Sequence, residues 1–359
     1  MKTQETNLQT ARTRRAFALA AILAVALVAG NVRTAEAGAP PPPPPPPSPN
    51  VLGLASGWGI TVHGSRWITS RTAEVDISTG AVATNAVNGP HRIRITLPGN
   101  YYSSGGTRFP VLYLLHGGAG GNSAQWTTGG GAAEYITRNR PLITVMPDGG
   151  KVGWYTDWLN MSAGSQAWEH FHLYQLIPWV DANFRTIARR EGRAIAGLSM
   201  GGFGAIHYAQ QRPDLFIYAG SFSGALDLEN QGIRTVITEQ TMQNGFPVDG
   251  PFGWPVIGLD GAWIANNPLR RADRLRGMHI ALYAGDGIHD ADVLERTVGW
   301  STYQMHLSLN AAGVPHFYWM YGRPGPGTPW NCDGGHNFGC WNKALEHMVP
   351  MMMNVLWHP

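Results

Sequence analysis

Short apolar segments alternate with longer amphipathic ones over most of the chain. Residues 111–115 and 142–146 are almost entirely apolar, as expected for strands covered on both faces. Residues 91–97 alternate polar and apolar side chains, the pattern of a half-buried strand. Further short strands are predicted at 194–196, 217–222, 280–284 and 317–321, and helices at 165–184, 200–211, 293–312 and 341–357. This alternation predicts an α/β fold, a mostly parallel sheet with helices on both faces.

Segments of unusual composition follow several of these strands. They are residues 117–122, 148–160, 197–201, 286–295 and the stretch around His336. In an open parallel sheet the loops that follow the strands meet along one edge, and ligands bind there. We therefore expect the chemistry of the protein at this edge.

The first of these segments with a defined chemistry is Gly197-Leu198-Ser199-Met200-Gly201, a G-x-S-x-G motif between a predicted strand and a predicted helix. That context is the one a nucleophile elbow requires, because the turn is tight and leaves room only for small residues beside the serine. The hydroxyl of Ser199 would lie near the helix N-terminus. The N–H of Met200 would then face a developing oxyanion.

An elbow serine needs a histidine and an acid, which follow it in the order serine, acid, histidine. Among the histidines after Ser199, His336 lies in a loop between the last predicted strand and the last predicted helix. His207, His306 and His347 fall inside predicted helices, which favours packing or surface positions. We therefore predict that His336 is the general base.

Position alone leaves the acid open. Four carboxylates follow the predicted strand 280–284, namely Asp286, Asp290, Asp292 and Glu295. Either type of carboxylate can hold the histidine tautomer and stabilise the imidazolium.

From about residue 91 to its end the chain resembles the esterase family of α/β hydrolases, which includes esterase D-type hydrolases and the antigen 85 mycolyltransferases of mycobacteria. The resemblance rests on VLYLLHGG (111–118), VMPDGG (145–150), GWYTDW (153–158), IAGLSMGGFGA (195–205), FIYAGSFSG (216–224) and GGHNFGCW (334–341). It implies an α/β-hydrolase fold and a serine mechanism.

The resemblance also implies roles for single residues. In the antigen 85 pattern the acid precedes an Asn-Ala-Ala-Gly by fifteen residues, and Glu295 stands at that distance from Asn310. Glu295 is therefore favoured as the acid. The family histidine is followed five residues later by a tryptophan, as His336 is by Trp341. The family oxyanion hole implies the N–H of Gly118 beside that of Met200.

One departure concerns the alcohol that accepts the acyl group. The trehalose-using members have an aspartate where this chain has His116, so the resemblance argues against trehalose and towards the ordinary hydrolases. His116 and Trp158 are predicted to contact substrate. Other tryptophans near the predicted edge, Trp154, Trp254 and Trp263, could line the same groove, with simple packing as the alternative.

Cys332 and Cys340 are the two cysteines of the chain, and they flank His336. In a secreted protein such a pair is most simply a disulfide, and the alternative is two thiols. Closing so short a loop would stabilise the protein by about 2.5 kcal/mol in the chain-entropy model. The bond would fix the loop that carries the predicted base.

The N-terminal region predicts export. Residues 16–30 form an apolar run after three arginines, followed by the small-residue site Ala35-Glu36-Ala37, so residues 1–37 are predicted to be a secretory signal peptide. An uncleaved anchor is the alternative. An uninterrupted run of eight prolines, Pro40 to Pro47, then stiffens a linker over residues 38–50, which is either a stalk at the cell envelope or a spacer without a partner. Residues 51–359 are predicted to be one esterase domain.

Charge excludes one class of function. The first 37 residues hold five of the 26 lysines and arginines and two of the 23 acidic residues, so the remaining chain has 21 of each. Nucleic-acid binding usually requires a basic excess, and none remains. No cofactor motif is recognised. A metal site is not predicted either, because His170 and His172 lie two positions apart on a predicted helix and would face different sides, and no H-E-x-x-H motif occurs.

Together these patterns predict a secreted serine esterase that acts on small-molecule or lipid esters, in association with the cell envelope or free of it. One alternative is an acyltransferase that moves the acyl group to a sugar or glycerol hydroxyl. A second is a non-catalytic envelope-binding protein on the same scaffold, which would have no need of an elbow serine.

Overall fold

The computed structural model describes residues 49–84, 89–288, 292–322 and 330–357. The predicted signal peptide and nearly all of the proline-rich linker lie outside them. Nine strands in this part of the chain form a single sheet. They are β1 (Ile60–Trp67), β2 (Thr72–Thr79), β3 (His91–Thr96), β4 (Val111–Leu115), β5 (Ile143–Pro147), β6 (Arg193–Leu198), β7 (Tyr218–Phe222), β8 (His279–Gly285) and β9 (His316–Tyr321).

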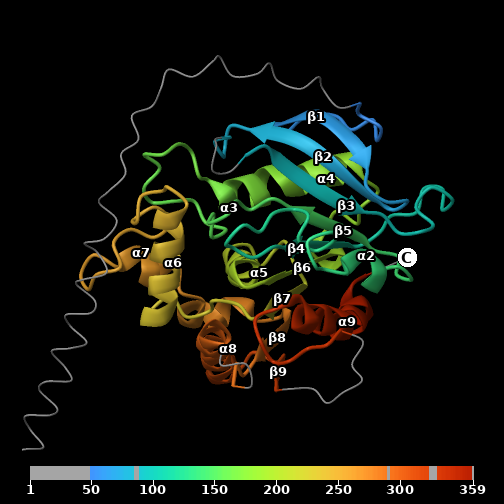
Figure 1. Ribbon diagram of the computed structural model, residues 1–359. Helices are drawn as coiled ribbons and strands as arrows, with labels where there is room; N and C mark the ends of the chain where they lie inside the picture. Colours follow the sequence, from blue (N-terminus) through green and yellow to red (C-terminus); the bar gives the residue numbers. More distant parts are fainter. Residues whose placement is uncertain (1–48, 85–88, 289–291, 323–329, 358–359) are drawn as a thin grey trace, which may run out of the picture. The chain divides into compact units, whose positions relative to one another are not determined.

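The strand order is β1-β2-β3-β5-β4-β6-β7-β8-β9 (Figure 1). The pairs from β5 to β9 are parallel, and β1, β2 and β3 extend the sheet as an antiparallel ribbon. The predicted α/β-hydrolase fold is confirmed. All the predicted strands are present, with ends shifted by at most two residues. β1 and β2 were not predicted.

Helices cover both faces of the sheet. They are α2 (Ala133–Ile136), α3 (Trp168–His170), α4 (Ile177–Asn183), α5 (Met200–Gln211), α6 (Gln231–Gln243), α7 (Gly261–Ala265), α8 (Val293–Ala311) and α9 (Phe338–Val355). Side chains of β4 alternate between two buried clusters, with Tyr113 and Leu115 in one and Leu112 and Leu114 in the other. The second cluster is closed by α9, which contacts β7 and β8.

Two predicted helices differ in detail from the observed ones. The helix expected at 165–184 is interrupted by a π-helical segment, Phe171–Leu176, just before Pro178. Proline lacks the N–H that a regular α-helical turn would use there. The last helix begins at Phe338, three residues earlier than expected, because the side chain of Asn337 accepts a hydrogen bond from the N–H of Cys340 and caps it. No helix among the described residues is long and apolar enough to cross a membrane.

Candidate active site

Ser199 lies on the sharp turn between β6 and α5. Its backbone has φ 53° and ψ −118°, a strained conformation for a residue with a side chain. The neighbouring glycines make the turn feasible, because a Cβ on Gly197 would lie 2.3 Å from the carbonyl oxygen of Gly201, and a Cβ on Gly201 would lie 2.5 Å from that of His116. This is the local geometry that the G-x-S-x-G motif predicts.

A chain of hydrogen bonds joins the three residues that the sequence singled out. Nε2 of His336 is 3.0 Å from Oγ of Ser199, and Nδ1 of His336 is 2.6 Å from Oε2 of Glu295. Glu295 is fully buried in the first turn of α8. A carboxylate at Nδ1 fixes the tautomer that leaves Nε2 free to accept the serine proton.

The other oxygen of Glu295 is held as firmly. Oε1 accepts hydrogen bonds from the N–H of Gly285, at 2.5 Å, and from the hydroxyl of Ser223, at 2.8 Å. Ser223 in turn accepts a hydrogen bond from the indole N–H of Trp341, at 3.1 Å, and the Trp341 ring meets that of His336 edge-on. The sequence analysis assigned no role to Ser223, which directly follows β7.

The remaining acid candidates occupy other places. Oδ1 of Asp292 caps α8 by accepting from the N–H of Glu295, and its Oδ2 accepts from the N–H of His336, both at 2.9 Å. Burial raises the pKa of Asp292, but these backbone hydrogen bonds and the nearby His336 ring lower it below its usual value. Asp286 accepts from the N–H of Ile288, and Asp290 lies outside the described residues.

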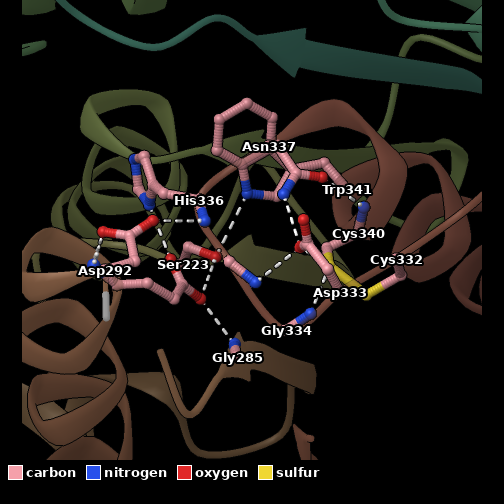
Figure 2. The surroundings of a disulfide bond; sticks show 12 residues. Ser223, Gly285, Asp292, Cys332, Asp333, Gly334, His336, Asn337, Cys340 and Trp341 are labelled. Atoms are coloured by element: carbon pink, nitrogen blue, oxygen red, sulfur yellow. Dashed lines mark hydrogen bonds and ion pairs between the residues drawn. A yellow bond between two sulfur atoms is a disulfide. The ribbon is translucent and has the colours of Figure 1, made fainter. Parts of the chain in front are cut away.

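The loop that carries His336 is tied down by a disulfide. Cys332 and Cys340 are bonded, with Cα atoms 4.3 Å apart, as the predicted pairing requires. Within the loop, Oδ1 of Asp333 accepts from the side chain of Asn337 and from the N–H of Gly335. Figure 2 shows the disulfide beside this network, with His336 next to Asp292 and Ser223.

The predicted oxyanion donors belong to a cavity of about 110 Å³ that Ser199 and His336 also line. Gly118 and Met200 are neighbours, because a Cβ on Gly118 would lie 3.6 Å from the Met200 sulfur. The N–H groups on either side of Gly118 have other partners. That of Gly117 donates to Gln125, and that of Ala119 donates to the carbonyl of Lys151.

Aliphatic side chains form much of the cavity wall. They are Leu198, Ala225, Ile233, Val236, Leu294 and Val298, and several come from α6 and α8. The sequence did not predict α6, so this wall was missed. Of the tryptophans considered from sequence, Trp154 lines the cavity, whereas Trp263 is fully buried and Trp254 is exposed.

The two predicted substrate contacts, His116 and Trp158, are absent from the described lining of this cavity. Trp158 is 4% exposed, packs against Phe246 and donates to the carbonyl of Gly153. His116 is 1% exposed, and its ring bridges the carbonyl of Gly117 and the N–H of Gly149. In this placement both side chains pack the loops, and their contact with substrate stays a prediction.

A second buried group of histidines surrounds Asp148, just after β5. The carboxylate lies 3.4 Å from Nε2 of His116 and 3.7 Å from Nδ1 of His91, and the Asp148 carbonyl is 2.9 Å from Nε2 of His172. Burial raises the pKa of Asp148, but the His116 and His91 rings outweigh it and lower the pKa to about 2. Burial lowers the pKa of His172 to about 3. We call these four residues the Asp148 cluster.

Residues that could hold a metal are sparse in this structure. Within the described part of the chain, no group of three or more histidine, cysteine, aspartate or glutamate side chains is arranged to bind a metal ion.

Known proteins similar to this chain include both esterases and acyltransferases. Esterase Rv1288 of Mycobacterium tuberculosis is 37% identical over 65% of this chain, and the matched region is 52% of that relative, about half its length. The diacylglycerol acyltransferase/mycolyltransferase Ag85B of Mycobacterium leprae is 31% identical over 71% of this chain and 79% of its own.

Solved structures share the fold at lower identity. MPT51 (FbpC1) of Mycobacterium tuberculosis has a TM-score of 0.58 and 22% identity, covering 77% of this chain and 97% of that one. An S-formylglutathione hydrolase of Agrobacterium tumefaciens has a TM-score of 0.60 and 13% identity, covering 82% and 99%. A family model named Esterase matches residues 84–352. The chain therefore belongs to this esterase family of α/β hydrolases.

Proposed function

We propose that the protein is a serine esterase that hydrolyses carboxylic esters through an acyl-enzyme on Ser199. The observation that carries the proposal is the chain of hydrogen bonds from Ser199 through His336 to Glu295. Each of the three side chains has the partner that its step requires, and the serine opens onto a cavity. Geometry of this kind supports a catalytic triad more strongly than sequence position does.

The proposed reaction has two halves. Oγ of Ser199 attacks the ester carbonyl as Nε2 of His336 takes its proton, and the imidazolium is stabilised by Glu295. The tetrahedral oxyanion accepts hydrogen bonds from the N–H groups of Gly118 and Met200, and each such donor typically contributes about 10²–10³ in rate. His336 then protonates the departing alcohol. Water then enters, gives a proton to His336 and attacks the acyl carbonyl. The bond to Oγ of Ser199 breaks, Oγ takes that proton back from His336, and the free acid leaves.

The apolar cavity suggests which part of the ester lies where. Its walls from α6 and α8 are aliphatic, so they fit the acyl chain better than a polar alcohol. A volume of about 110 Å³ favours a short acyl group unless α6 and α8 separate.

The test uses p-nitrophenyl esters of increasing acyl length with the wild type and Ser199→Ala. We expect turnover that falls at least about 10⁴-fold in the variant, as in other serine hydrolases, and a maximum at short acyl chains. Turnover that survives in Ser199→Ala would contradict the proposed nucleophile. A complete lack of turnover on every ester would favour the non-catalytic binding protein.

A second candidate function is transfer of the acyl group to an alcohol. The acyltransferase named among the relatives favours it, and the acyl-enzyme would be the same. Adding glycerol or trehalose to the assay separates the two, because transfer produces a new ester whereas hydrolysis produces only the free acid.

We also propose that residues 1–37 direct the chain to secretion and are removed, that residues 38–50 are a linker, and that residues 51–359 are the catalytic domain. N-terminal sequencing of the protein recovered from the medium of an expressing culture tests this. A mature N-terminus close to residue 38 is expected. An intact N-terminus on cell-bound protein would favour the uncleaved anchor.

A further inference from the structure

The loop after β4 borders two cavities. Its residues 117–119 line the apolar cavity around Ser199, and residues 120–124 line a second cavity of about 310 Å³. Lys151 lies between the two, since its carbonyl accepts the hydrogen bond from Ala119 while the residue itself lines the second cavity. We call the second cavity the cationic cavity.

Its lining carries more positive than negative side chains. The cations are Arg66, Arg92, Arg94 and Lys151, and the acids are Glu74 and Asp148. Asp76 does not line the cavity but pairs with Arg66 and Arg92. Counting all three acids as ionised, the cations still exceed them by one. The arginines come from β1 and β3 of the antiparallel ribbon, which places them beside the edge where Asp148 follows β5.

The acidic side chains do not pair with every N–H donor of these cations. Arg94 is buried and committed, because it donates to Glu74 and to the hydroxyls of Thr127 and Thr128. The side chains of Arg66 and Arg92 remain 42% and 43% exposed. Each guanidinium has five N–H donors, more than its carboxylate partners use.

Among the four cations, Lys151 has the fewest side-chain partners in the described part of the chain. It is exposed, and among the described residues no carboxylate lies within ion-pair distance of its ammonium group. A cavity that holds two half-exposed guanidinium groups and one unpaired ammonium group is suited to an oxyanion, which accepts charge-assisted hydrogen bonds from them.

We propose that the cationic cavity binds an anionic group, a carboxylate or a phosphate, on the alcohol part of the ester. This inference rests on the proposed function. If the acyl chain occupies the apolar cavity and the carbonyl oxygen lies at Gly118, the alkoxy group is the part of the substrate left to extend along the loop. The cationic cavity begins two residues beyond Gly118, at Gly120.

Binding is tested first, without catalysis, by calorimetry on the wild type with glycerol, glycerate and sn-glycerol 3-phosphate. We expect glycerate, sn-glycerol 3-phosphate or both to bind at least tenfold more tightly than glycerol. The anion that binds more tightly shows whether the cavity prefers a carboxylate or a phosphate. Lys151→Gln should reduce that advantage about fivefold or more, and Arg92→Gln should reduce it too. Arg276→Gln is the matched control, because Arg276 is 62% exposed and precedes β8, which is far from β1 and β3 in the strand order.

Equal binding of all three ligands would overturn the proposal, and so would equal losses in Lys151→Gln and Arg276→Gln. The kinetic arm compares kcat/KM for 1-butyrylglycerol and its 3-phosphate, and for the corresponding butyryl ester of glycerate. The ratio of anionic to neutral ester should exceed one in the wild type and fall about tenfold in Lys151→Gln. A wild-type ratio of one or below would contradict the inference but not the esterase proposal. Lack of turnover of all these esters and of p-nitrophenyl butyrate would contradict the esterase proposal, and the calorimetry would still decide what the cavity binds.

Discussion

Two buried carboxylates lie beside histidines along the same edge of the sheet, and the two groups differ in whether a histidine nitrogen faces a cavity. In the first, Glu295 holds one nitrogen of His336, and the other nitrogen faces Ser199 in a cavity. In the Asp148 cluster the histidine nitrogens face the protein. Those of His116 meet backbone groups, and those of His172 meet the hydroxyl of Tyr208 and the carbonyl of Asp148.

A histidine beside a carboxylate is therefore not sufficient for proton transfer. The N–H of Gly149 points at Nε2 of His116, and Nδ1 lies 2.6 Å from the carbonyl oxygen of Gly117, so both ring nitrogens have backbone partners. That arrangement connects the loop after β4 to the turn after β5. The first group has the geometry that the proposed proton transfer needs, whereas the hydrogen bonds of the Asp148 cluster hold the loop that contains Gly118.

The largest expected effect separates the two histidines. His336→Ala should lower kcat on p-nitrophenyl butyrate at least about 10⁴-fold, because it removes the proposed base, and its main effect should fall on catalysis rather than on stability. His116→Ala should do the reverse, lowering the free energy of unfolding by about 2 kcal/mol since two buried backbone groups lose their partner, with a smaller loss of kcat. Steady-state kinetics and urea unfolding of both variants measure this. Comparable losses of kcat in the two would break the distinction.

Glu295→Gln comes next. Its amide nitrogen would donate to Nδ1 of His336 and leave the proton on Nε2, so the ring could no longer accept from Ser199. A wrong tautomer of this kind costs about 10⁴ in kcat. Asp292→Asn is the matched control, because Asp292 holds backbone N–H groups rather than the ring, and it should cost less than about tenfold. A larger loss in Asp292→Asn than in Glu295→Gln would reassign the acid.

The sequence predicted the parallel part of the sheet better than its antiparallel ribbon. Strands such as β4 and β5 are buried on both faces and therefore read as apolar runs. β2 alternates apolar and polar side chains, but its polar positions are the acids Glu74 and Asp76, a residue type depleted in strands, and these pair with arginines on β1 and β3. Only the paired strands make these charges compatible with a sheet, and a single segment of sequence does not contain that information.

The candidate site divides in the same way. Ser199 and His336 stand in local motifs, so sequence could single them out, and the structure brings them together with Glu295. His116 was expected to contact substrate because of its position in a motif. Its orientation depends on Gly149, more than thirty residues away, which spacing along the chain could not reveal. The α6 wall of the cavity was missed for a similar reason, since its apolar residues become neighbours of Ser199 only in the fold.

The disulfide tests how far the first group depends on its loop. Replacing Cys332 and Cys340 by alanine should lower the free energy of unfolding by about 2.5 kcal/mol through loop closure. It should also lower kcat, because His336 lies within the closed loop. Urea unfolding and kinetics of the double variant check both effects. Loss of stability with unchanged kcat would mean that Asp292 and Trp341 hold His336 in place without the disulfide.

The smallest expected effect concerns pH and the Asp148 cluster. Burial lowers the pKa of His172 to about 3, against a usual value of 6.5, so the folded protein keeps this ring neutral while the unfolded chain protonates it. Stability should therefore be complete above about pH 6.5 and fall as the pH drops towards 3, by up to about 1.4 kcal/mol per pH unit. In thermal unfolding, the stability of His172→Gln should decline less steeply between pH 6.5 and 4.5. Part of the decline should remain, because burial also lowers the pKa of His207. His170→Gln, an exposed neighbour on the same helix, should retain the wild-type slope. An unchanged slope in His172→Gln would mean that the cluster accepts a proton in the folded state, and the two groups would then be less different than their hydrogen bonds indicate.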